Sequence, residues 1–360
     1  MLVLLTGGTG FIGARLLEKL LARDHVVRVL VRPEKAKQFS RRRNVETVVG
    51  TLADARILAE SMNGVDTVYH LAWQSNRRNA AELSEGDKAE EVRANISGAR
   101  ILLRASVTSE ARRFIYTSTV SVYDNSLKNG HPISEDHPLA HEGQGGRNIH
   151  KQYTEPKIEV ENMIRRFSNK YGLEYVILRP AIVYGAGAPF AEDWVRRSLR
   201  AQWSAGGAGR FQPVQLVHVD DVVDALLLAG TEARAANQEF NVAGAEAATE
   251  AQLQLMIKMI AARLRRGLPP AEWPARHLPN LQRRDLQRYD LTKAKSLLKY
   301  APKVSLREGL EEMVSAVLGE DEPRGGEQNG GGEEPPGAGG GRGFGGAARL
   351  LRGRGARLWR

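Results

Sequence analysis

One stretch near the start of the chain, "LVLLTGGTGFIGARLLEKLL", constrains the fold more than any other. A short apolar run leads into Gly7, Gly10 and Gly13, and leucines at helical spacing follow at once. Glycines between a strand and a helix are typical of dinucleotide binding. Gly7 permits the tight turn, Gly10 lets a pyrophosphate approach the backbone, and Gly13 lets the helix pack closely on the strand. The helix N-terminus then offers unpaired N–H groups to the phosphates.

Short β-rich runs alternate with amphipathic segments through the first two-thirds of the chain. The runs are "HVVRVLV", "VETVV", "DTVYHLA", "RFIYTST" and "EYVILRP". This alternation predicts an α/β fold of Rossmann type, a doubly wound parallel sheet with helices on both faces. Later helical patterns, among them "EAQLQLMIKMIAARL" and "LREGLEEMVSAVL", predict a small, mostly helical C-terminal lobe. We expect a cofactor domain over 1–180, its sheet completed by segments up to about 245, and an interleaved substrate lobe over 181–318.

The composition excludes several classes of protein and site. The chain has no cysteine, so it can form neither a disulfide nor a thiolate metal site. No apolar run approaches the roughly 20 residues that span a bilayer. The start, "MLVLLTGGTG", lacks the basic flank of a signal peptide, so we expect a cytoplasmic protein. The Gly-, Pro- and Arg-rich stretch over 319–360 has little to bury and predicts a disordered tail.

The net charge of +10 has two interpretations. Basic residues cluster at 32–43 and at 263–266. They can form a solvated surface, or they can attract anionic ligands such as phosphates. Aromatic residues do not interleave these clusters, so we expect no specific nucleic-acid partner.

The second β-rich run discriminates between dinucleotides. An acidic residue at its end would bind the ribose hydroxyls of NAD. The run "VVRVLVRP" ends instead at Arg32, with Lys35 and Lys37 nearby. An arginine there can stack on adenine and pair with a 2′-phosphate. The sequence therefore favours NADP over NAD as the cofactor.

Seven motifs between Met1 and about Leu318 resemble, in the same order, those of the extended short-chain dehydrogenase/reductase family, the NAD(P)-dependent epimerase/dehydratase group. They are "TGGTGFIG", "VYHLAW", "ANISGARILL", "FIYTSTVSVYD", "YTEPK", "LRPAIVYGAG" and "LVHVDDVVDAL". The resemblance implies that Thr119, Tyr153 and Lys157 are catalytic. It implies substrate contacts from Trp73, Thr119 and Tyr184. Together with the glycine loop and the second strand, it implies cofactor contacts from Gly7, Thr9, Gly10, Phe11, Ile12, Gly13, Arg32, Leu52, Leu71, Ala72, Thr117, Tyr153, Lys157, Pro180 and Val183.

The pentapeptide "YTEPK" puts Tyr153 and Lys157 one helical turn apart on one face. Pro156 fits if the helix begins near Tyr153, because first-turn N–H groups have no intrahelical partner. A free tyrosine has a pKa near 10 and is a poor base, but a nearby ammonium and an oxidised nicotinamide favour the phenolate. Tyr153 would then exchange a proton with the substrate oxygen while hydride passes to or from the cofactor. The resemblance implies that Lys157 binds the nicotinamide ribose and that Thr119 forms a hydrogen bond with the reacting oxygen.

Three departures from the family pattern bear on the site. Thr51 replaces an aspartate that many relatives carry, which leaves Leu52 as an apolar wall. The segment "HEGQGGRN" before Tyr153 predicts an elaborated loop beside the substrate cleft. Nucleotide-sugar relatives usually carry Arg-Asp where this chain has Val214 and Gln215, and Arg210 lies four residues earlier. The missing arginine weakens the case for a diphosphate substrate.

Four histidines, His131, His137, His141 and His150, could suggest a metal site. Their spacing follows no ligand pattern, and no carboxylate-rich motif accompanies them. Loop polarity explains them better, and we expect no metal.

Three functions stay open at this point. The favoured one is an NAD(P)-dependent oxidoreductase of the epimerase/dehydratase type that acts on a secondary alcohol or ketone. The second is a nucleotide-sugar 4-epimerase or dehydratase, which oxidises and then re-reduces its substrate. The third is a non-catalytic NAD(P)-binding sensor or scaffold. The expected partner is a small molecule, and a homodimer is compatible with each function.

Overall fold

The structure, a computed structural model, describes residues 1–39, 42–74, 84–124, 131–140, 151–200, 213–267 and 289–319. The "HEGQGGRN" segment, Arg210, His141 and His150 lie outside the described residues. So does the stretch predicted to be a disordered tail, apart from Gly319, which ends the last helix.

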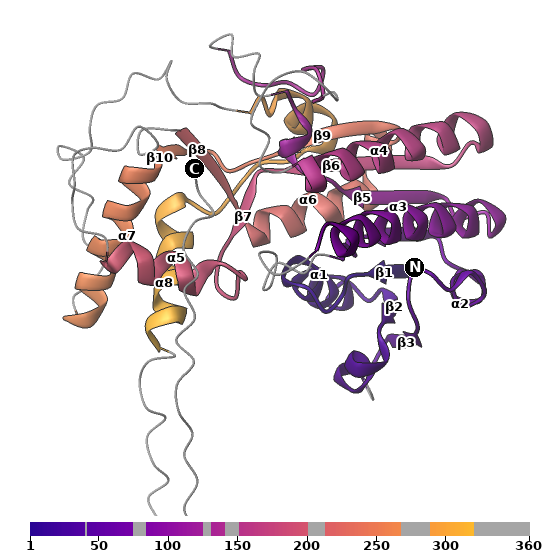
Figure 1. Ribbon diagram of the computed structural model, residues 1–360, viewed down its shortest axis with the longest axis horizontal. Helices are drawn as coiled ribbons and strands as arrows, with labels where there is room; N and C mark the ends of the chain where they lie inside the picture. Colours follow the sequence, from indigo (N-terminus) through magenta and orange to yellow (C-terminus); the bar gives the residue numbers. More distant parts are fainter. Residues whose placement is uncertain are drawn as a thin grey trace, which may run out of the picture.

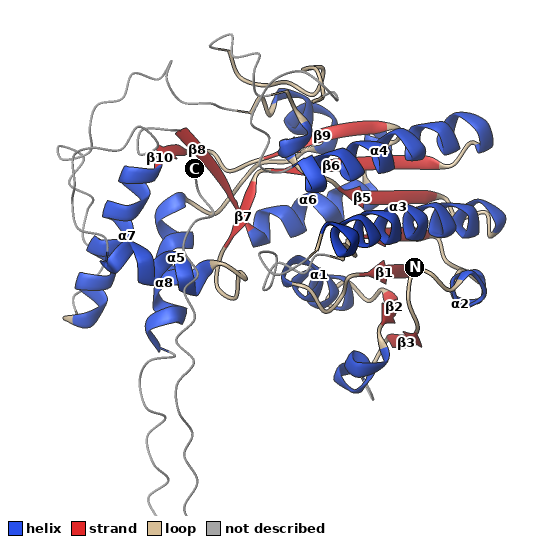
Figure 2. Cartoon of the chain, in the orientation of Figure 1, coloured by secondary structure: helices blue, strands red, loops and turns tan. Residues whose placement is uncertain are grey.

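Seven parallel strands form the main sheet, in the order β3-β2-β1-β4-β5-β6-β9 (Figure 1; Figure 2). Every neighbouring pair in it is parallel. The strands are β1 (Leu2–Thr6), β2 (Val26–Val31), β3 (Val45–Val49), β4 (Thr67–His70), β5 (Arg113–Thr117), β6 (Glu174–Pro180) and β9 (Gln238–Val242). The five predicted β-rich runs are β2 to β6, so the prediction of a doubly wound parallel sheet is confirmed.

Alternate side chains of the strands enter two separate cores, one on each face of the sheet. Val3 and Leu5 share a buried cluster with α1 and α6, whereas Leu4 shares one with α2, α3 and α4. These helices are α1 (Phe11–Leu21), α2 (Ala55–Ser61), α3 (Glu85–Thr108), α4 (Lys151–Tyr171) and α6 (Val219–Thr231). Successive strand residues point to opposite faces, so a sheet that is covered on both sides needs nearly continuous apolar strands.

A smaller lobe lies beside the main sheet (Figure 1). Its helices are α5 (Ala191–Arg200), α7 (Glu250–Arg265) and α8 (Leu306–Gly319), which share one buried core. The lobe also holds a three-stranded sheet in the order β10-β8-β7, which the sequence did not predict. Its strands are β7 (Ile182–Tyr184), β8 (Pro213–His218) and β10 (Ala247–Thr249). The predicted division into domains at 180 stays a prediction.

Short helices complete the described chain. They are the 3₁₀ helices η1 (Pro33–Phe39), η3 (Val120–Val122) and η5 (Ala233–Ala235), and the π-helix η8 (Ala294–Leu298). Among the described residues, no helix is both long enough and apolar enough to cross a bilayer.

The strand order creates a crevice at one end of the main sheet. The chain runs outward from β1 through β2 to β3, and then returns to the other side of β1 as β4. The loops that leave β1 and β4 therefore diverge to opposite faces. Open α/β sheets bind ligands at such a switch point, at the carboxyl ends of the strands.

Arg15 of α1 ties the smaller lobe to the main sheet. Its guanidinium donates to Asp220 of α6 at 3.2 Å and to Glu312 of α8 at 2.9 Å. It also donates to the carbonyl oxygen of Ala186, just after β7, at 3.3 Å. All three charged side chains are partly exposed, so each ion pair contributes modestly to stability. Together these bonds fix the position of α8 relative to α1 and the glycine loop before it.

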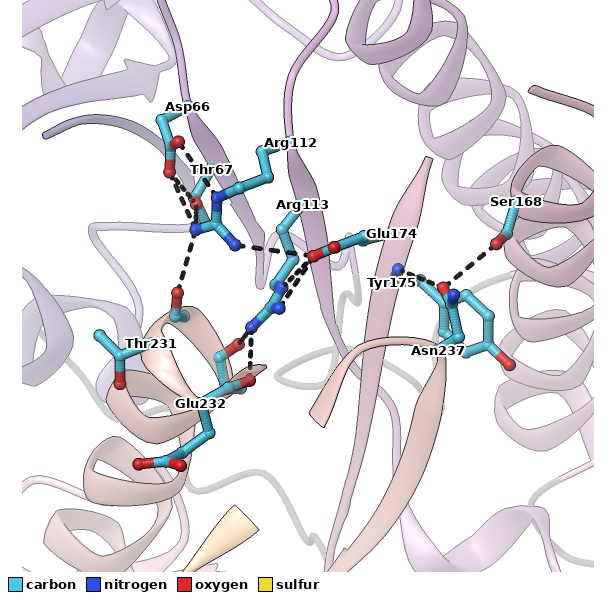
Figure 3. Close-up of polar contacts among 12 residues, drawn as sticks. Asp66, Thr67, Arg112, Arg113, Ser168, Glu174, Tyr175, Thr231, Glu232 and Asn237 are labelled. Carbon is cyan, nitrogen blue, oxygen red and sulfur yellow. Dashed lines mark hydrogen bonds and ion pairs between the residues drawn. The ribbon is translucent and has the colours of Figure 1, made fainter. Parts of the chain in front are cut away.

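Two neighbouring arginines anchor α6 at the opposite end of the sheet (Figure 3). Arg113, which is 2% exposed, donates to Glu174 at 2.8 Å and to the carbonyls of Ala229 and Glu232 at 2.8 and 2.9 Å. The last carbonyls of a helix lack intrahelical partners, and a cation there is favourable. Arg113 therefore joins the C-terminus of α6 to the first residues of β5 and β6.

Arg113→Leu should lower the free energy of unfolding by roughly 3 kcal/mol, because it removes a buried guanidinium that pairs with the partly exposed Glu174 and donates to two carbonyls. Arg112 is the matched control. It pairs with Asp66 at 3.0 Å and donates to the Gly230 carbonyl, but its side chain is 39% exposed. Arg112→Leu should therefore cost about 1 kcal/mol or less. Urea unfolding measures both changes, and equal losses would contradict this account.

Candidate active site

The glycine loop follows β1, and two of its glycines have no room for a side chain. Gly7 adopts a φ of +79°, and a Cβ there would lie 2.7 Å from the amide nitrogen of Ala72. A Cβ on Gly13 would overlap the carbonyl oxygen of Gly7. A tight turn and close packing of α1 therefore both depend on glycine, which agrees with the roles that the sequence predicted for these two residues.

The N-terminus of α1 keeps its first N–H groups available. Gly10 provides the N-cap without a side-chain hydrogen bond, and no acidic residue lies in the first turn. Thr9 and Gly10 are exposed, and Phe11 and Ile12 are half-buried. A Cβ on Gly10 would meet only the Gly7 carbonyl oxygen, at 3.2 Å. This open, uncapped helix end fits the pyrophosphate of a dinucleotide.

A neutral histidine supports the loop after β4. The Nδ1 atom of His70 lies 2.8 Å from the Thr6 hydroxyl oxygen. That oxygen also accepts a hydrogen bond from the Ala72 amide at 3.2 Å. Burial, reinforced by the charge of Lys157, lowers the pKa of His70 to about 3. His70 is therefore uncharged at physiological pH, and it holds Leu71 and Ala72 in place as a hydrogen-bonding support.

Asn95 of α3 fixes the far end of the same loop. Its side chain accepts the Gln74 amide and donates to the Gln74 carbonyl, both at 2.8 Å. The sequence placed Asn95 in a motif but gave it no role, because its partner lies in another loop. Gly98 lies one turn further along α3, where a Cβ would come within 2.7 Å of the Cβ of Leu52. Leu52 is half-buried against α3 as a result.

The ammonium of Lys157 lies at the centre of the site. It is 4% exposed and donates to the carbonyl oxygen of Thr117, the last residue of β5, at 2.9 Å. The nitrogen also lies 4.0 Å from the ring centroid of Trp73, 4.8 Å from that of Tyr116 and 5.9 Å from that of Tyr153. The rings of Trp73 and Tyr153 meet edge to face at 5.8 Å. The fold thus brings together four residues that the sequence assigned to the site.

Thr119 follows β5 and starts η3. Its hydroxyl accepts the Ser121 amide and donates to the Ser121 hydroxyl, both at 3.2 Å. It is 9% exposed and lies two residues beyond Thr117. Thr119 therefore lies just beyond the end of β5, whose last residue accepts the hydrogen bond from Lys157. The hydrogen bonds of Thr119 itself are local.

Four buried hydroxyls of β5, the residue after it and α4 have no hydrogen-bond partner in the described part of the chain. They are the side-chain oxygens of Tyr116, Thr117, Ser118 and Thr154. Buried polar groups are normally satisfied. The free hydroxyl of Thr117 is the most informative, because Thr117 was predicted to contact the cofactor. Its orphaned oxygen fits a polar ligand in this position.

Helix α4, which carries Tyr153 and Lys157, begins earlier than predicted. It starts at Lys151, so Pro156 lies inside the helix and beyond the first turn. The expectation that Pro156 would fall among the free first-turn N–H groups is therefore wrong. Its missing N–H leaves the carbonyl four residues earlier without the usual helical partner.

Arg32 follows β2 directly, at the same end of the sheet as the glycine loop. Its side chain is exposed and forms an ion pair with Glu34 at 3.0 Å. Thr51, after β3, is exposed as well. The guanidinium is thus accessible to a ligand, at the modest cost of a surface ion pair.

Three predicted site residues lie at the end of β6 and in β7. Pro180 ends β6 and is buried, and Val183 of β7 is half-buried. Tyr184 is buried in the core of the smaller lobe, with its hydroxyl 3.5 Å from the Ser305 carbonyl oxygen and its ring against Gly309. The structure gives Tyr184 a packing role, and its substrate contact stays a prediction.

The position of the predicted diphosphate arginine is occupied by Val214, and a structural glutamine follows it. Gln215 of β8 is buried, donates to the Gly244 carbonyl at 2.7 Å and accepts the Tyr289 amide at 2.8 Å. Both the nitrogen and the oxygen of its side-chain amide are therefore hydrogen-bonded to the backbone. Val214 beside it packs against the lobe core.

A cavity of about 650 Å³ lies between α3 and α4, but on the other side of α4 from Lys157. It is lined by Lys88, Val92, Ile96, Pro156 and Ile158, among others, and by none of the predicted catalytic residues. Over the described ranges, no group of three histidine or acidic side chains could hold a metal ion. The ring of His137 contacts the Asp124 carbonyl at 3.0 Å.

Known proteins resemble this chain in sequence and in fold. The NAD dependent epimerase/dehydratase family matches residues 3–243. The 4-hydroxy-2-methyl-3-oxo-4-farnesyl-3,4-dihydroquinoline-1-oxide ketoreductase of Stigmatella aurantiaca is 30% identical over 265 residues, which are 72% of this chain and 73% of the relative. The UDP-glucose 4-epimerase of Mycolicibacterium smegmatis is 30% identical over 330 residues, 87% and 97% of the two chains. A crystal structure of UDP-glucose 4-epimerase with UDP-glucose from Thermotoga maritima has a TM-score of 0.69 and 28% identity, and covers 89% of this chain and all of that one.

Two alanine substitutions in the glycine loop should separate folding from dinucleotide binding. Gly13→Ala should lower both the stability, by roughly 1–3 kcal/mol, and the NADH affinity, because its methyl group displaces the Gly7 carbonyl. Gly10→Ala should leave the stability unchanged within about 0.5 kcal/mol. It should nevertheless weaken NADH binding, because the methyl group occupies the side open to phosphate. Thermal unfolding and NADH fluorescence measure the two effects. Wild-type NADH affinity in Gly10→Ala would place the phosphates elsewhere.

Proposed function

This chain belongs to the NAD-dependent epimerase/dehydratase family, and we propose that it reduces a ketone, or oxidises the matching secondary alcohol, with Tyr153 as the proton-transfer group. Membership makes the chain an oxidoreductase-type enzyme rather than a sensor or scaffold. The observation that carries the proposal is the cluster of Trp73, Thr117, Tyr153 and Lys157 at the strand ends beside the glycine loop.

A nicotinamide dinucleotide fits the residues of this site. The uncapped end of α1 would hold the pyrophosphate, and Lys157 and the unpaired Thr117 hydroxyl would hold the nicotinamide ribose. The cofactor supplies or accepts the hydride when it is bound. The remaining chemistry is done by the protein, which orients the substrate and exchanges one proton.

Tyr153 is the residue that can exchange this proton. In the reductive direction its hydroxyl donates the proton to the carbonyl oxygen of the ketone, and in the oxidative direction its phenolate accepts the proton back. The Lys157 ammonium on the same helix face stabilises that phenolate. Thr119 would donate a hydrogen bond to the same substrate oxygen and so fix its position.

The favoured substrate is a ketone or secondary alcohol without a diphosphate. Val214 and Gln215 stand where nucleotide-sugar relatives carry Arg and Asp, and Gln215 has both amide ends engaged with the backbone. The similar ketoreductase acts, by its name, on a farnesylated quinoline ketone. The half-buried Trp73 provides an apolar surface next to Tyr153 for such a substrate.

A nucleotide-sugar 4-epimerase is the second candidate. Its support is the similarity to two UDP-glucose 4-epimerases, which extends over most of this chain. The two functions differ in how the cofactor is used, because an epimerase regenerates it within each cycle. Native mass spectrometry of the purified protein, followed by assays with aliphatic and aromatic ketones and with UDP-glucose, distinguishes them. Retained cofactor with UDP-galactose formation supports the epimerase, and NAD(P)H consumption with a ketone supports the reductase.

Tyr153→Phe should lower turnover by roughly 10²-fold or more, the range that is typical of losing a general acid–base group. Cofactor affinity should survive, because the glycine loop and Lys157 remain. Lys157→Met should impair both turnover and cofactor binding. Tyr116→Phe is the matched control. The Tyr116 ring lies 4.8 Å from the same ammonium, and its buried hydroxyl has no hydrogen-bond partner among the described residues. Full turnover by Tyr153→Phe on an identified substrate would move the proton-transfer role to another residue.

We further propose that NADP is preferred over NAD, since Arg32 ends β2 with an exposed guanidinium. Arg32→Asp should weaken NADPH binding and spare NADH binding, because the new carboxylate repels the 2′-phosphate. Arg56→Asp is the control, with the same charge change on an exposed residue of α2. Fluorescence titration of both cofactors checks the prediction. Equal affinity of the wild type for NADH and NADPH would contradict it.

A further inference from the structure

An acidic residue lies on the face of α4 that carries Tyr153 and Lys157. Glu161 follows Lys157 by one helical turn, so the three side chains line one face. Glu161 is fully buried and accepts two hydrogen bonds from Arg179 of β6, at 2.7 and 3.1 Å. The catalytic face of α4 is therefore attached to two adjacent strand ends, through Lys157 to β5 and through Glu161 to β6.

Arg179 extends the connection to the turn that carries Thr119. Its guanidinium also donates to the Tyr123 hydroxyl at 3.1 Å and to the Glu135 carbonyl at 3.2 Å. Tyr123 closes η3, the short helix that Thr119 starts, and its own hydroxyl donates to Asn241 at 2.6 Å. One guanidinium thus contacts both the helix of Tyr153 and the turn of Thr119.

The Arg179–Glu161 pair is unusual in its burial. Arg179 is 2% exposed, and Glu161 has no exposed surface. Burial lowers the pKa of Arg179, but its bonds to Glu161 and Tyr123 outweigh burial and raise it, so the side chain stays charged. A buried ion pair rarely stabilises a fold more than apolar residues of the same volume would. Its bidentate, planar geometry does fix relative positions.

We propose that Arg179 is a positioning residue, which sets the Thr119 turn against the Tyr153 and Lys157 face of α4. The proposal rests on the catalytic roles proposed above for these three residues. Another arginine–glutamate pair in the same sheet provides a comparison with a structural role only. Arg113, which is as buried as Arg179, pairs with the partly exposed Glu174 at the other end of β5 and β6, remote from the site.

Two substitutions weaken the connection without leaving an uncompensated charge. Arg179→Lys keeps the positive charge beside Glu161, but a single ammonium replaces the fork that reaches both sides. Tyr123→Phe removes only the hydroxyl on the Thr119 side. We expect each to lower kcat by roughly 10- to 100-fold, as misplaced reacting groups do. Cofactor Kd should stay unchanged, because the glycine loop is untouched. The double variant should lose no more than Arg179→Lys alone, because both break one connection.

Arg113→Lys is the control that separates position from stability. The assay uses whichever ketone or sugar nucleotide the wild type turns over, and Tyr153→Phe is measured in parallel. Protein labelled with ¹³Cζ-tyrosine gives a second measurement without substrate, with the Tyr153 resonance assigned by its loss in Tyr153→Phe. The proposal expects Arg179→Lys to shift this resonance and to lower kcat, and Arg113→Lys to do neither.

Two results would overturn different parts of this account. A kcat for Arg179→Lys that falls no further than that of Arg113→Lys, with an unshifted Tyr153 resonance, rejects the positioning role alone. An unchanged kcat in Tyr153→Phe rejects the proposed function, whatever Arg179 does. If neither arginine variant folds, Tyr123→Phe carries the test, because it retains both charges of the buried pair.

Discussion

The arrangement of the site depends on one buried cation, the ammonium of Lys157. Burying an ammonium costs several kcal/mol unless the protein replaces its hydration. Here a carbonyl oxygen at the end of β5 and the faces of two aromatic rings provide that replacement. Trp73 comes from the loop after β4, Thr117 from β5 and Lys157 itself from α4. The need to solvate one charge therefore draws three separate elements to the carboxyl edge of the sheet, beside the glycine loop.

Two titratable groups near this cation are held neutral or paired. His70 is kept neutral by burial and by Lys157, and it serves only to hold the loop that carries Trp73. The nearest carboxylate on the same helix face, Glu161, is neutralised by Arg179. A tyrosine hydroxyl near an ammonium is the arrangement that the proposed proton transfer at neutral pH requires.

The sequence predicted the local features well and the long-range ones poorly. Gly7 and Gly13 were assigned from spacing alone, because a turn and a helix start are local events, and the five strands from β2 to β6 were read from apolar runs. Asn95 and Arg179 could not be assigned roles, since their partners lie in other loops and helices. The strands β7 and β10 each have three residues, too few for a periodic pattern. Pro156 was misplaced because helix α4 begins before the motif that it carries.

Gln215 shows why the fold does not decide the substrate. In β8 it bridges the Gly244 carbonyl and the Tyr289 amide, and so ties the small sheet of the lobe to two other segments. Beside it, Val214 is half-buried against the core of the lobe, at the position where the family resemblance predicts the diphosphate-binding arginine. This chain thus has an apolar residue where the resemblance predicts a cation for a diphosphate. A fold like that of the UDP-glucose 4-epimerases can therefore serve a different substrate, because residues of the smaller lobe can differ while the main sheet is kept.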